Sequence, residues 1–376
     1  MSALSQGLWY KLKTQHFDPK WRAARRFSTP VLPTRPFGVL ESVIGPETRQ
    51  ALFRSGVVSK MHSPSSQLRP LGLLCETVNI CNADCVFCPY SQQTRKLGTM
   101  TPELFATVCQ QYAALGGGPM SLTPMVGDVL LDKELPGRLR TLQQHRGSIA
   151  PSITTNLYAL DRHSDDVILQ MMETFVRIHI STYGVTEEEN TAITRRRHFR
   201  KYVEQAGRLG ELWERSDKRC QIMIGFRNIY NHDRELLRSF VQQSFGHDWA
   251  AGGTSTYCNW GGRMGGKLPG DAVWVSPRSN HTPCLLLITA MQVYWDGRVS
   301  ACACCDYDAG EDLSLGSLAD STLSELYNSA TNRRIWADQE SGQMQPICRQ
   351  CTFHVPLREL QPSDSLARGW IEFVGG

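Results

Sequence analysis

Cysteine is the residue type most able to do chemistry in this sequence, and most of its thirteen copies are grouped. Cys81, Cys85 and Cys88 lie together. A second group far along the chain comprises Cys284, Cys302, Cys304, Cys305, Cys348 and Cys351. Thiolates at such spacings are typical ligands of zinc or of iron–sulfur clusters. The other four cysteines, Cys75, Cys109, Cys220 and Cys258, are scattered, and an isolated cysteine is most often a small buried hydrophobe.

The composition favours reduced thiols over disulfides. The cysteine count is odd, the chain has 376 residues, and residues 1–30 lack the apolar segment of a secretory signal. Because no apolar run approaches the ~20 residues that cross a bilayer, we expect a cytoplasmic protein without a membrane span. The 40 basic and 36 acidic residues nearly balance, so nucleic acid is not an expected partner.

Between residues 71 and 258, apolar segments of strand length alternate with helical patterns, which is typical of an α/β protein with a parallel sheet. The strands are predicted at 71–79, 121–126, 152–156, 176–182, 221–228 and just before Cys258. Helices are predicted from Thr101 to a stop at Gly116-Gly117-Gly118, and near 133–145, 164–175, 199–216 and 232–245. Six units are too few for a closed eight-stranded barrel, so a partial (β/α)6 TIM-like barrel is expected, with its chemistry at the carboxyl ends of the strands.

The barrel is predicted to span residues 71–260, after an N-terminal extension at 1–70 that shows no clear periodicity. Residues 261–283 are rich in Gly, Pro, Asn and Ser and are interpreted as a linker. A small C-terminal domain follows at 284–376. It is expected to contain a β-hairpin over 291–302, turned by Asp296-Gly297, and an amphipathic helix over 317–339.

Three thiolates in a loop after the first strand make an incomplete ligand set. Either a distant Cys or His completes a zinc site, or an iron of a [4Fe-4S] cluster keeps an open position for a ligand. The loop sequence CNADCVFCPY (81–90) resembles the cluster loop of the radical S-adenosylmethionine (SAM) superfamily. The resemblance implies that SAM chelates the open iron, and that an electron from a donor such as flavodoxin or ferredoxin then cleaves SAM to a 5′-deoxyadenosyl radical. It also places Phe87 near the adenine of SAM.

Later strand ends also resemble this superfamily. Gly127 and Asp128 stand where the family has a Gly-Gly-Glu segment that contacts the SAM amino group, and the resemblance favours contact through the backbone over contact through Asp128. Asn156 belongs to a Thr-Asn-Leu sequence in place of Thr-Asn-Gly. Ser181 ends the fourth predicted strand, where similar enzymes place a hydroxyl near SAM, and Arg195 is the implied basic residue after it.

Four cysteines of the second group, Cys284, Cys302, Cys348 and Cys351, can form a closed site for zinc or for a fully ligated cluster. Their surroundings resemble the auxiliary-cluster domains called SPASM and Twitch. No cysteine follows Cys351, so the shorter Twitch type with one auxiliary [4Fe-4S] cluster is expected. Cys302 is favoured over Cys304 and Cys305 because it keeps the family's spacing from Gly297.

The Twitch type resembles 2-deoxy-scyllo-inosamine dehydrogenase and related enzymes of antibiotic biosynthesis that act on sugars and aminocyclitols. This implies an oxidoreductase that converts a carbinol of a small polar molecule to a ketone, with the auxiliary cluster as electron acceptor. The alternatives are an epimerase with Cys258 as hydrogen donor, a maturase of ribosomal peptides, and a zinc-stabilised binding protein without catalytic activity.

Overall fold

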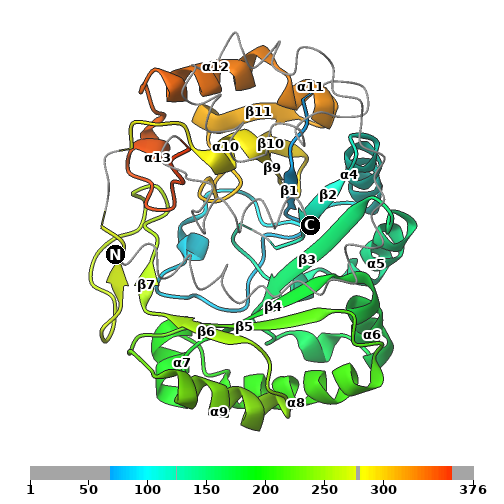
Figure 1. The fold of residues 1–376 in the computed structure, drawn as a ribbon, viewed down its shortest axis with the longest axis vertical. Coiled ribbons are helices and arrows are strands. Elements are labelled where there is room, and N and C mark those ends of the chain that lie inside the picture. The colour runs from blue at the N-terminus through cyan, green and yellow to red at the C-terminus, as the bar shows by residue number, and fades with distance from the viewer. Residues whose placement is uncertain (1–67, 124, 277–279, 358–376) are drawn as a thin grey trace.

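The computed structural model describes residues 68–123, 125–276 and 280–357, and its main feature is a nine-stranded sheet (Figure 1). Nearly all of the predicted N-terminal extension lies outside the described residues. The strands are ordered β11-β10-β9-β1-β2-β3-β4-β5-β6. The six strands from β1 to β6 follow each other in sequence and are all parallel. This confirms the predicted partial barrel.

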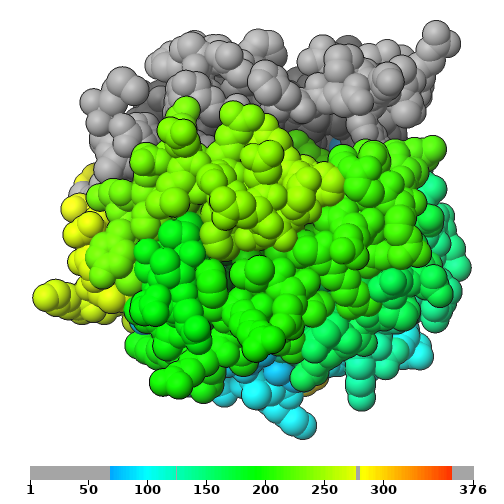
Figure 2. All heavy atoms as spheres, turned by 90° about the horizontal axis from the view of Figure 1, so that it is seen from below, coloured from blue at the N-terminus to red at the C-terminus, as the bar shows by residue number. Residues whose placement is uncertain are grey.

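The parallel strands are β1 (Gly72–Cys75), β2 (Gly118–Ser121), β3 (Ile149–Thr155), β4 (Arg177–Thr182), β5 (Gln221–Arg227) and β6 (Ala251–Thr254). Helices cover the outer side of the curved sheet (Figure 1). They are α4 (Pro102–Ala114), α5 (Leu135–Gln144), α6 (Asp165–Thr174), α8 (Phe199–Arg215) and α9 (Arg234–Phe245). Viewed from below, side chains of the green middle part of the chain form a continuous surface (Figure 2).

Local sequence signals account for several of these boundaries. Thr101 caps α4 by accepting a hydrogen bond from the Leu104 amide, as its position before Pro102 predicted. The helix α7 (Glu187–Thr194) was not predicted, because EEENTAIT is short, polar and without an apolar face. Short 3-10 helices occur at η2 (Pro89–Gln92), η3 (Val129–Leu131), η4 (Leu160–Arg162) and η5 (Glu311–Leu313).

The predicted position of the second strand, 121–126, is wrong. The strand β2 begins at Gly118, which the sequence interpretation had assigned to the glycine-rich stop of the preceding helix. Gly118 has φ +128 and pairs with Ile149 at the start of β3, so it belongs to the sheet. The apolar residues Met125 and Val126 lie in the loop after β2, where they pack against Tyr307.

The C-terminal hairpin extends the barrel sheet. β9 (Ala290–Val293) and β10 (Arg298–Ser300) are antiparallel, joined by the predicted Asp296-Gly297 turn, and β11 (Ser314–Ser317) follows β10. β9 also pairs with β1 over four residues in parallel. The residues predicted as linker contain β8 (Val273–Trp274), which pairs with β7 (Thr256–Tyr257). The two cysteine-bearing parts of the chain therefore share one hydrogen-bonded framework.

The single helix predicted over 317–339 is wrong. The chain forms α11 (Leu323–Tyr327) and α12 (Ala330–Glu340), because Ser329 caps a new helix by accepting from the Asn332 amide. The short helices α10 (Leu285–Thr289) and α13 (Pro346–Arg349) complete this region. Among the described residues, none of the helices has the length and apolar character that a bilayer span requires.

Two glycines of α8 offer a matched test of the packing between α8 and α9. A Cβ at Gly210 would lie 1.9 Å from the Phe245 carbonyl oxygen, whereas a Cβ at Gly207 would lie 3.7 Å from the Ser244 carbonyl oxygen. We expect Gly210→Ala to lower the free energy of unfolding by about 1–3 kcal/mol through overpacking. Gly207→Ala should raise it by up to about 1 kcal/mol, because Ala favours the helix. Urea unfolding of both variants checks this, and equal effects would contradict it.

Candidate functional site

The first three thiols lie in the loop that follows β1, which we call the cluster loop (residues 79–88). Cys85 is buried, and Cys81 and Cys88 are partly buried. Burial raises the pKa of all three thiols, that of Cys88 to about 12. Buried thiolates are costly without a compensating cation. Three of them in one loop therefore fit a bound iron–sulfur cluster, which supplies that positive charge.

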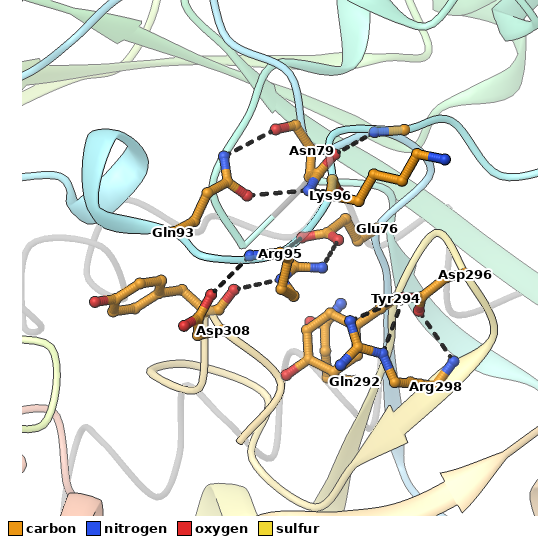
Figure 3. Close-up of polar contacts among 12 residues, drawn as sticks. Glu76, Asn79, Gln93, Arg95, Lys96, Gln292, Tyr294, Asp296, Arg298 and Asp308 are labelled. Carbon is orange, nitrogen blue, oxygen red and sulfur yellow. Dashed lines mark hydrogen bonds and ion pairs between the residues drawn. The ribbon is translucent and has the colours of Figure 1, made fainter. Parts of the chain in front are cut away.

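Hydrogen bonds of Asn79 join the start of the cluster loop to the segment that follows the loop (Figure 3). The side-chain amide nitrogen of Asn79 donates to Gln93 Oε1 and to the Lys96 carbonyl, both at 3.0 Å. The side-chain oxygen Oδ1 of Asn79 accepts from the backbone amide of Gly98 at 2.8 Å. Asn79 is fully buried. It fixes the start of the cluster loop, a role that no local sequence pattern indicates.

The unpredicted helix α7 supports the middle of the cluster loop. The Asp84 amide donates to the Thr194 carbonyl at 3.1 Å, and the Val86 amide donates to the Ile193 carbonyl at 2.9 Å. The Arg195 guanidinium, whose side chain is 55% exposed, pairs with Asp84 at 3.1 Å. Cys85 is therefore held between two hydrogen bonds to the end of α7, and Arg195 contacts the cluster loop itself.

Gly127 brings the loop after β2 against the cluster loop. Its φ is +147°, and a Cβ there would lie 3.0 Å from the Val78 carbonyl oxygen and 3.1 Å from the Asn79 backbone. The next amide, that of Asp128, donates to the Ile80 carbonyl at 2.8 Å. Only glycine meets both requirements without strain.

Asp128 joins the loop after β2 to the end of β3. Its carboxylate accepts from Thr155 Oγ1 at 2.9 Å, the Asn156 amide at 2.7 Å and the Leu130 amide at 3.0 Å. Burial raises the pKa of Asp128 to about 6, although these hydrogen bonds oppose the shift. Hydrogen-bond donors of the protein occupy both carboxylate oxygens, so the Asp128 side chain connects the loop after β2 to the end of β3.

Asn156 reaches the first thiol group directly. Its Nδ2 donates to Asn82 Oδ1 at 2.9 Å and lies 3.9 Å from Cys81 Sγ, within the range of an N–H···S hydrogen bond. The next residue, Leu157, has φ +63° and stands where the Thr-Asn-Gly sequence of similar enzymes has glycine. The structure therefore places Asn156 against a predicted cluster ligand.

Aromatic rings surround the cluster loop at the ends of β4 and β7. Phe87 stacks on Tyr257 with ring centroids 4.3 Å apart and an interplanar angle of 5°. The ring of Tyr183, just after β4, also lies beside Phe87, with its centroid 6.2 Å from that of Phe87. Ser181, at the end of β4, is 94% buried beside them in the same strand end. The sequence interpretation missed Tyr183, although an aromatic residue directly after a strand end is a usable signal.

The structure brings all six thiols of the second group together. Cys302 Sγ lies 3.8 Å from Cys304 Sγ, and Cys305 Sγ lies 3.6 Å from Cys351 Sγ. Cys284 and Cys348 interact electrostatically with both Cys302 and Cys351. The predicted ligands Cys284, Cys302, Cys348 and Cys351 are thus neighbours, but Cys304 and Cys305 are neighbours as well.

Cys258 precedes two residues that bond to both thiol groups: the Asn259 amide donates to Thr352 Oγ1 at 2.9 Å, next to Cys351, and the Trp260 indole N–H donates to the Phe87 carbonyl at 2.9 Å, next to Cys88. No three Cys, His, Asp or Glu side chains in the described part of the chain are arranged to hold a single metal ion. Thiol-only donor sets of this kind are typical ligands of iron–sulfur clusters.

Gly127 allows a direct test of how the loop after β2 supports the first thiol group. Gly127→Ala should displace the cluster loop, because overpacking of this kind costs about 1–3 kcal/mol. We expect less iron per chain after anaerobic reconstitution and a SAM dissociation constant about tenfold higher or more. The control is Gly147→Ala, because a Cβ at Gly147 meets no atom within 4 Å. Wild-type iron content and SAM affinity in Gly127→Ala would contradict the role given to this residue.

Comparisons with known proteins agree with this geometry. Residues 75–241 match the model of the radical SAM superfamily, and residues 284–352 match that of an iron–sulfur cluster-binding domain, SPASM. A comparison of the sequence with curated proteins gave no match.

Two solved structures share the fold. The crystal structure of BtrN in complex with AdoMet and 2-DOIA is 17% identical, with a TM-score of 0.51, and the match covers 78% of this chain and 98% of that one. Streptococcus suis SuiB bound to precursor peptide SuiA is 13% identical, with a TM-score of 0.53, over 77% of this chain and 71% of that one. At these identities the likeness concerns the fold.

The two matched domains, the shared fold and the two thiol groups lead to one conclusion. The chain is a radical SAM protein that binds SAM and a [4Fe-4S] cluster, and its C-terminal domain is of the kind that binds auxiliary iron–sulfur clusters.

Proposed function

We propose that this protein oxidises a carbinol of a small polar molecule, such as a sugar or an aminocyclitol, to a ketone. The carrying observation is that the segment after Cys258 joins the two thiol groups, because Asn259 is hydrogen-bonded to Thr352, next to Cys351, and Trp260 is hydrogen-bonded to Phe87, next to Cys88. Carbinol oxidation needs an electron acceptor near the carbon that loses hydrogen, and an auxiliary cluster in this position meets that need. BtrN, whose structure holds AdoMet and 2-DOIA, shares the fold and supports the choice of substrate class.

The residues of the chain divide into those that hold cofactors and those that orient them. Cys81, Cys85 and Cys88 would ligate the SAM-binding cluster, and the proposed SAM contacts are Phe87, the Gly127 and Asp128 backbone, Asn156, Ser181 and Arg195. When bound, SAM and its cluster supply the 5′-deoxyadenosyl radical that takes a hydrogen atom from substrate, after a donor such as flavodoxin or ferredoxin has provided an electron. The chain keeps the cluster loop in place through Gly127 and α7.

The inner face of the sheet supplies polar groups for a hydroxylated substrate. Thr182 Oγ1 contacts the Tyr202 hydroxyl on α8, so that side of β4 faces the helices, and His179 and Ser181 face the opposite side. His179 pairs in register with Thr154 of β3. Gly225 of β5 makes room for it, because a Cβ there would lie 2.3 Å from His179 Nε2. Hydroxyl and imidazole groups on this face suit a polyol ligand.

We further propose that Cys284, Cys302, Cys348 and Cys351 ligate one auxiliary [4Fe-4S] cluster. Two such clusters correspond to about eight irons per chain. We expect Cys302→Ser to lower the count to about four, because the auxiliary cluster is lost. Cys304→Ser should keep about eight. Anaerobic reconstitution with iron and sulfide analysis makes the measurement. Loss of iron in Cys304→Ser with retention in Cys302→Ser would reverse the choice of ligand.

Turnover in D2O tests the proposed reaction. With a panel of sugars and aminocyclitols under anaerobic conditions, the substrate should lose its carbinol hydrogen and its hydroxyl proton for each SAM consumed. Mass spectrometry of product and 5′-deoxyadenosine gives the ratio. Product of unchanged composition that carries a solvent deuteron at carbon would replace dehydrogenation by epimerisation.

The position of Cys258 supports epimerisation as the second candidate. A thiol between the two groups could return a hydrogen atom to a substrate carbon radical and so invert the carbon. Under this reading, Cys258→Ala would abolish the product and leave SAM cleavage intact. Under the dehydrogenase proposal, Cys258→Ala keeps ketone formation.

A further inference from the structure

A set of polar contacts joins the segment after the cluster loop to the segment after Cys305 (Figure 3). The Asp308 carboxylate accepts from the Thr94 amide and from Thr94 Oγ1, both at 2.7 Å, and from the Arg95 amide at 3.3 Å. These residues lie more than 200 positions apart in sequence. We call Thr94, Arg95 and Asp308 the tether.

The Arg95 guanidinium adds a buried part to the tether. It forms a bidentate ion pair with Glu76 at 2.6 and 2.9 Å, and its Nε donates to the Tyr307 carbonyl at 2.8 Å. Its other face lies 4.7 Å from the centre of the Tyr294 ring. The side chains of Arg95 and Glu76 are only 2% and 0% exposed. One side chain therefore contacts β1, the hairpin and the segment after Cys305.

Each residue of this network lies close in sequence to one of the thiol groups. Glu76 leads from β1 into the cluster loop, and Tyr307 and Asp308 follow the Cys302–Cys305 segment directly. The Tyr307 side chain packs with Met125 and Val126, against which Cys88 also packs. A movement of Asp308 would therefore be transmitted to both groups.

The energetics favour a positioning role over a purely stabilising one. A buried ion pair contributes little net stability compared with apolar residues of similar volume, because both charges lose their hydration. Its bidentate geometry, however, fixes orientation in a way that apolar packing does not. The tether thus restricts how the second thiol group can move relative to the first.

We propose that Arg95 and Asp308 are positioning residues that hold the auxiliary-cluster thiols at a fixed place relative to the SAM-cluster thiols. This inference rests on the proposed function for its catalytic consequence. Conversion of the carbinol to the ketone removes a hydrogen atom, taken by the 5′-deoxyadenosyl radical, then a proton to a base and an electron to the auxiliary cluster. The tether fixes the auxiliary cluster relative to the SAM-binding cluster, beside which the substrate radical forms, and so limits the distance that this last electron crosses.

The test variants are Asp308→Ala and Arg95→Lys, with Asp312→Ala as control. Asp308 is partly exposed, so its removal breaks the tether without leaving a buried charge unpaired. Arg95→Lys keeps the charge but loses the bidentate contact. Asp312 is an exposed carboxylate in the same loop region and has no contact with the tether among the described residues.

Two measurements detect the effect of these substitutions. The first is the number of 5′-deoxyadenosine molecules formed per ketone, which should rise by roughly tenfold to a hundredfold in both tether variants, because an error of about 1 Å has effects of that size. The second is the magnetic interaction between the two reduced clusters, measured by electron paramagnetic resonance without substrate. We expect this interaction to become weaker or to spread over a broader range of values in both tether variants. Both should stay at wild-type values in Asp312→Ala.

The inference is overturned if both tether variants keep the wild-type ratio and the wild-type magnetic interaction. It is also overturned if Asp308→Ala loses the auxiliary irons, because the tether would then be needed to assemble the site. If the wild-type protein forms no ketone from any compound, the proposed function fails. The magnetic measurement still decides the positioning role in that case.

Discussion

The cost of ionising buried thiols is the constraint on which the rest of this structure depends. Most of the thiols in the two groups are buried, and burial raises the pKa of Cys81, Cys85 and Cys348. The surrounding chain provides donors that partly offset this cost, such as the Asn156 amide near Cys81 Sγ and the Cys305 amide, which donates to Cys302 Sγ at 3.4 Å. Full compensation requires bound metal, so the arrangement of these loops makes physical sense only with cofactors in place.

The strands that lead to both thiol groups belong to one sheet, and their pairing sets the position of one group relative to the other. β1 leads into the cluster loop, and β9, which pairs with β1 over four residues, follows Cys284 by a short helix. Backbone hydrogen bonds fix the relative height of these two strands. The tether then fixes the loops at their carboxyl ends. The proposed electron transfer from substrate to the auxiliary cluster would require such a rigid frame, which a flexible linker between separate domains would not provide.

The sequence predicted the features that depend on local chemistry. The Thr101 cap, the Asp296-Gly297 turn and the grouping of Cys81, Cys85 and Cys88 each rest on a few neighbouring residues. The errors arose where tertiary packing overrides local preference. Gly118 pairs within the sheet instead of ending a helix, and α7 is stabilised by the cluster loop that it supports.

Long-range contacts could not be predicted at all. Glu76 is an acid inside an apolar segment, and nothing near it in sequence indicates that Arg95 neutralises it. The spacing argument preferred Cys302 to Cys304 and Cys305, but it could not show that all three thiols converge. That convergence depends on how residues 302–308 fold back against the hairpin, which is set by contacts such as that of Tyr294 with the Asp306 carbonyl.

Two turns that present the site carry backbone strain. Leu157 and Arg195 both adopt left-handed conformations, which cost a non-glycine residue about 1 kcal/mol or more. Leu157 follows Asn156, which reaches Cys81, and Arg195 ends α7 where the helix supports the cluster loop. Surrounding packing enforces both turns, since Leu157 is 99% buried and the α7 end is hydrogen-bonded to Asp84 and Val86. The packing around both turns therefore holds Asn156 and the end of α7 in the positions from which they contact the cluster loop.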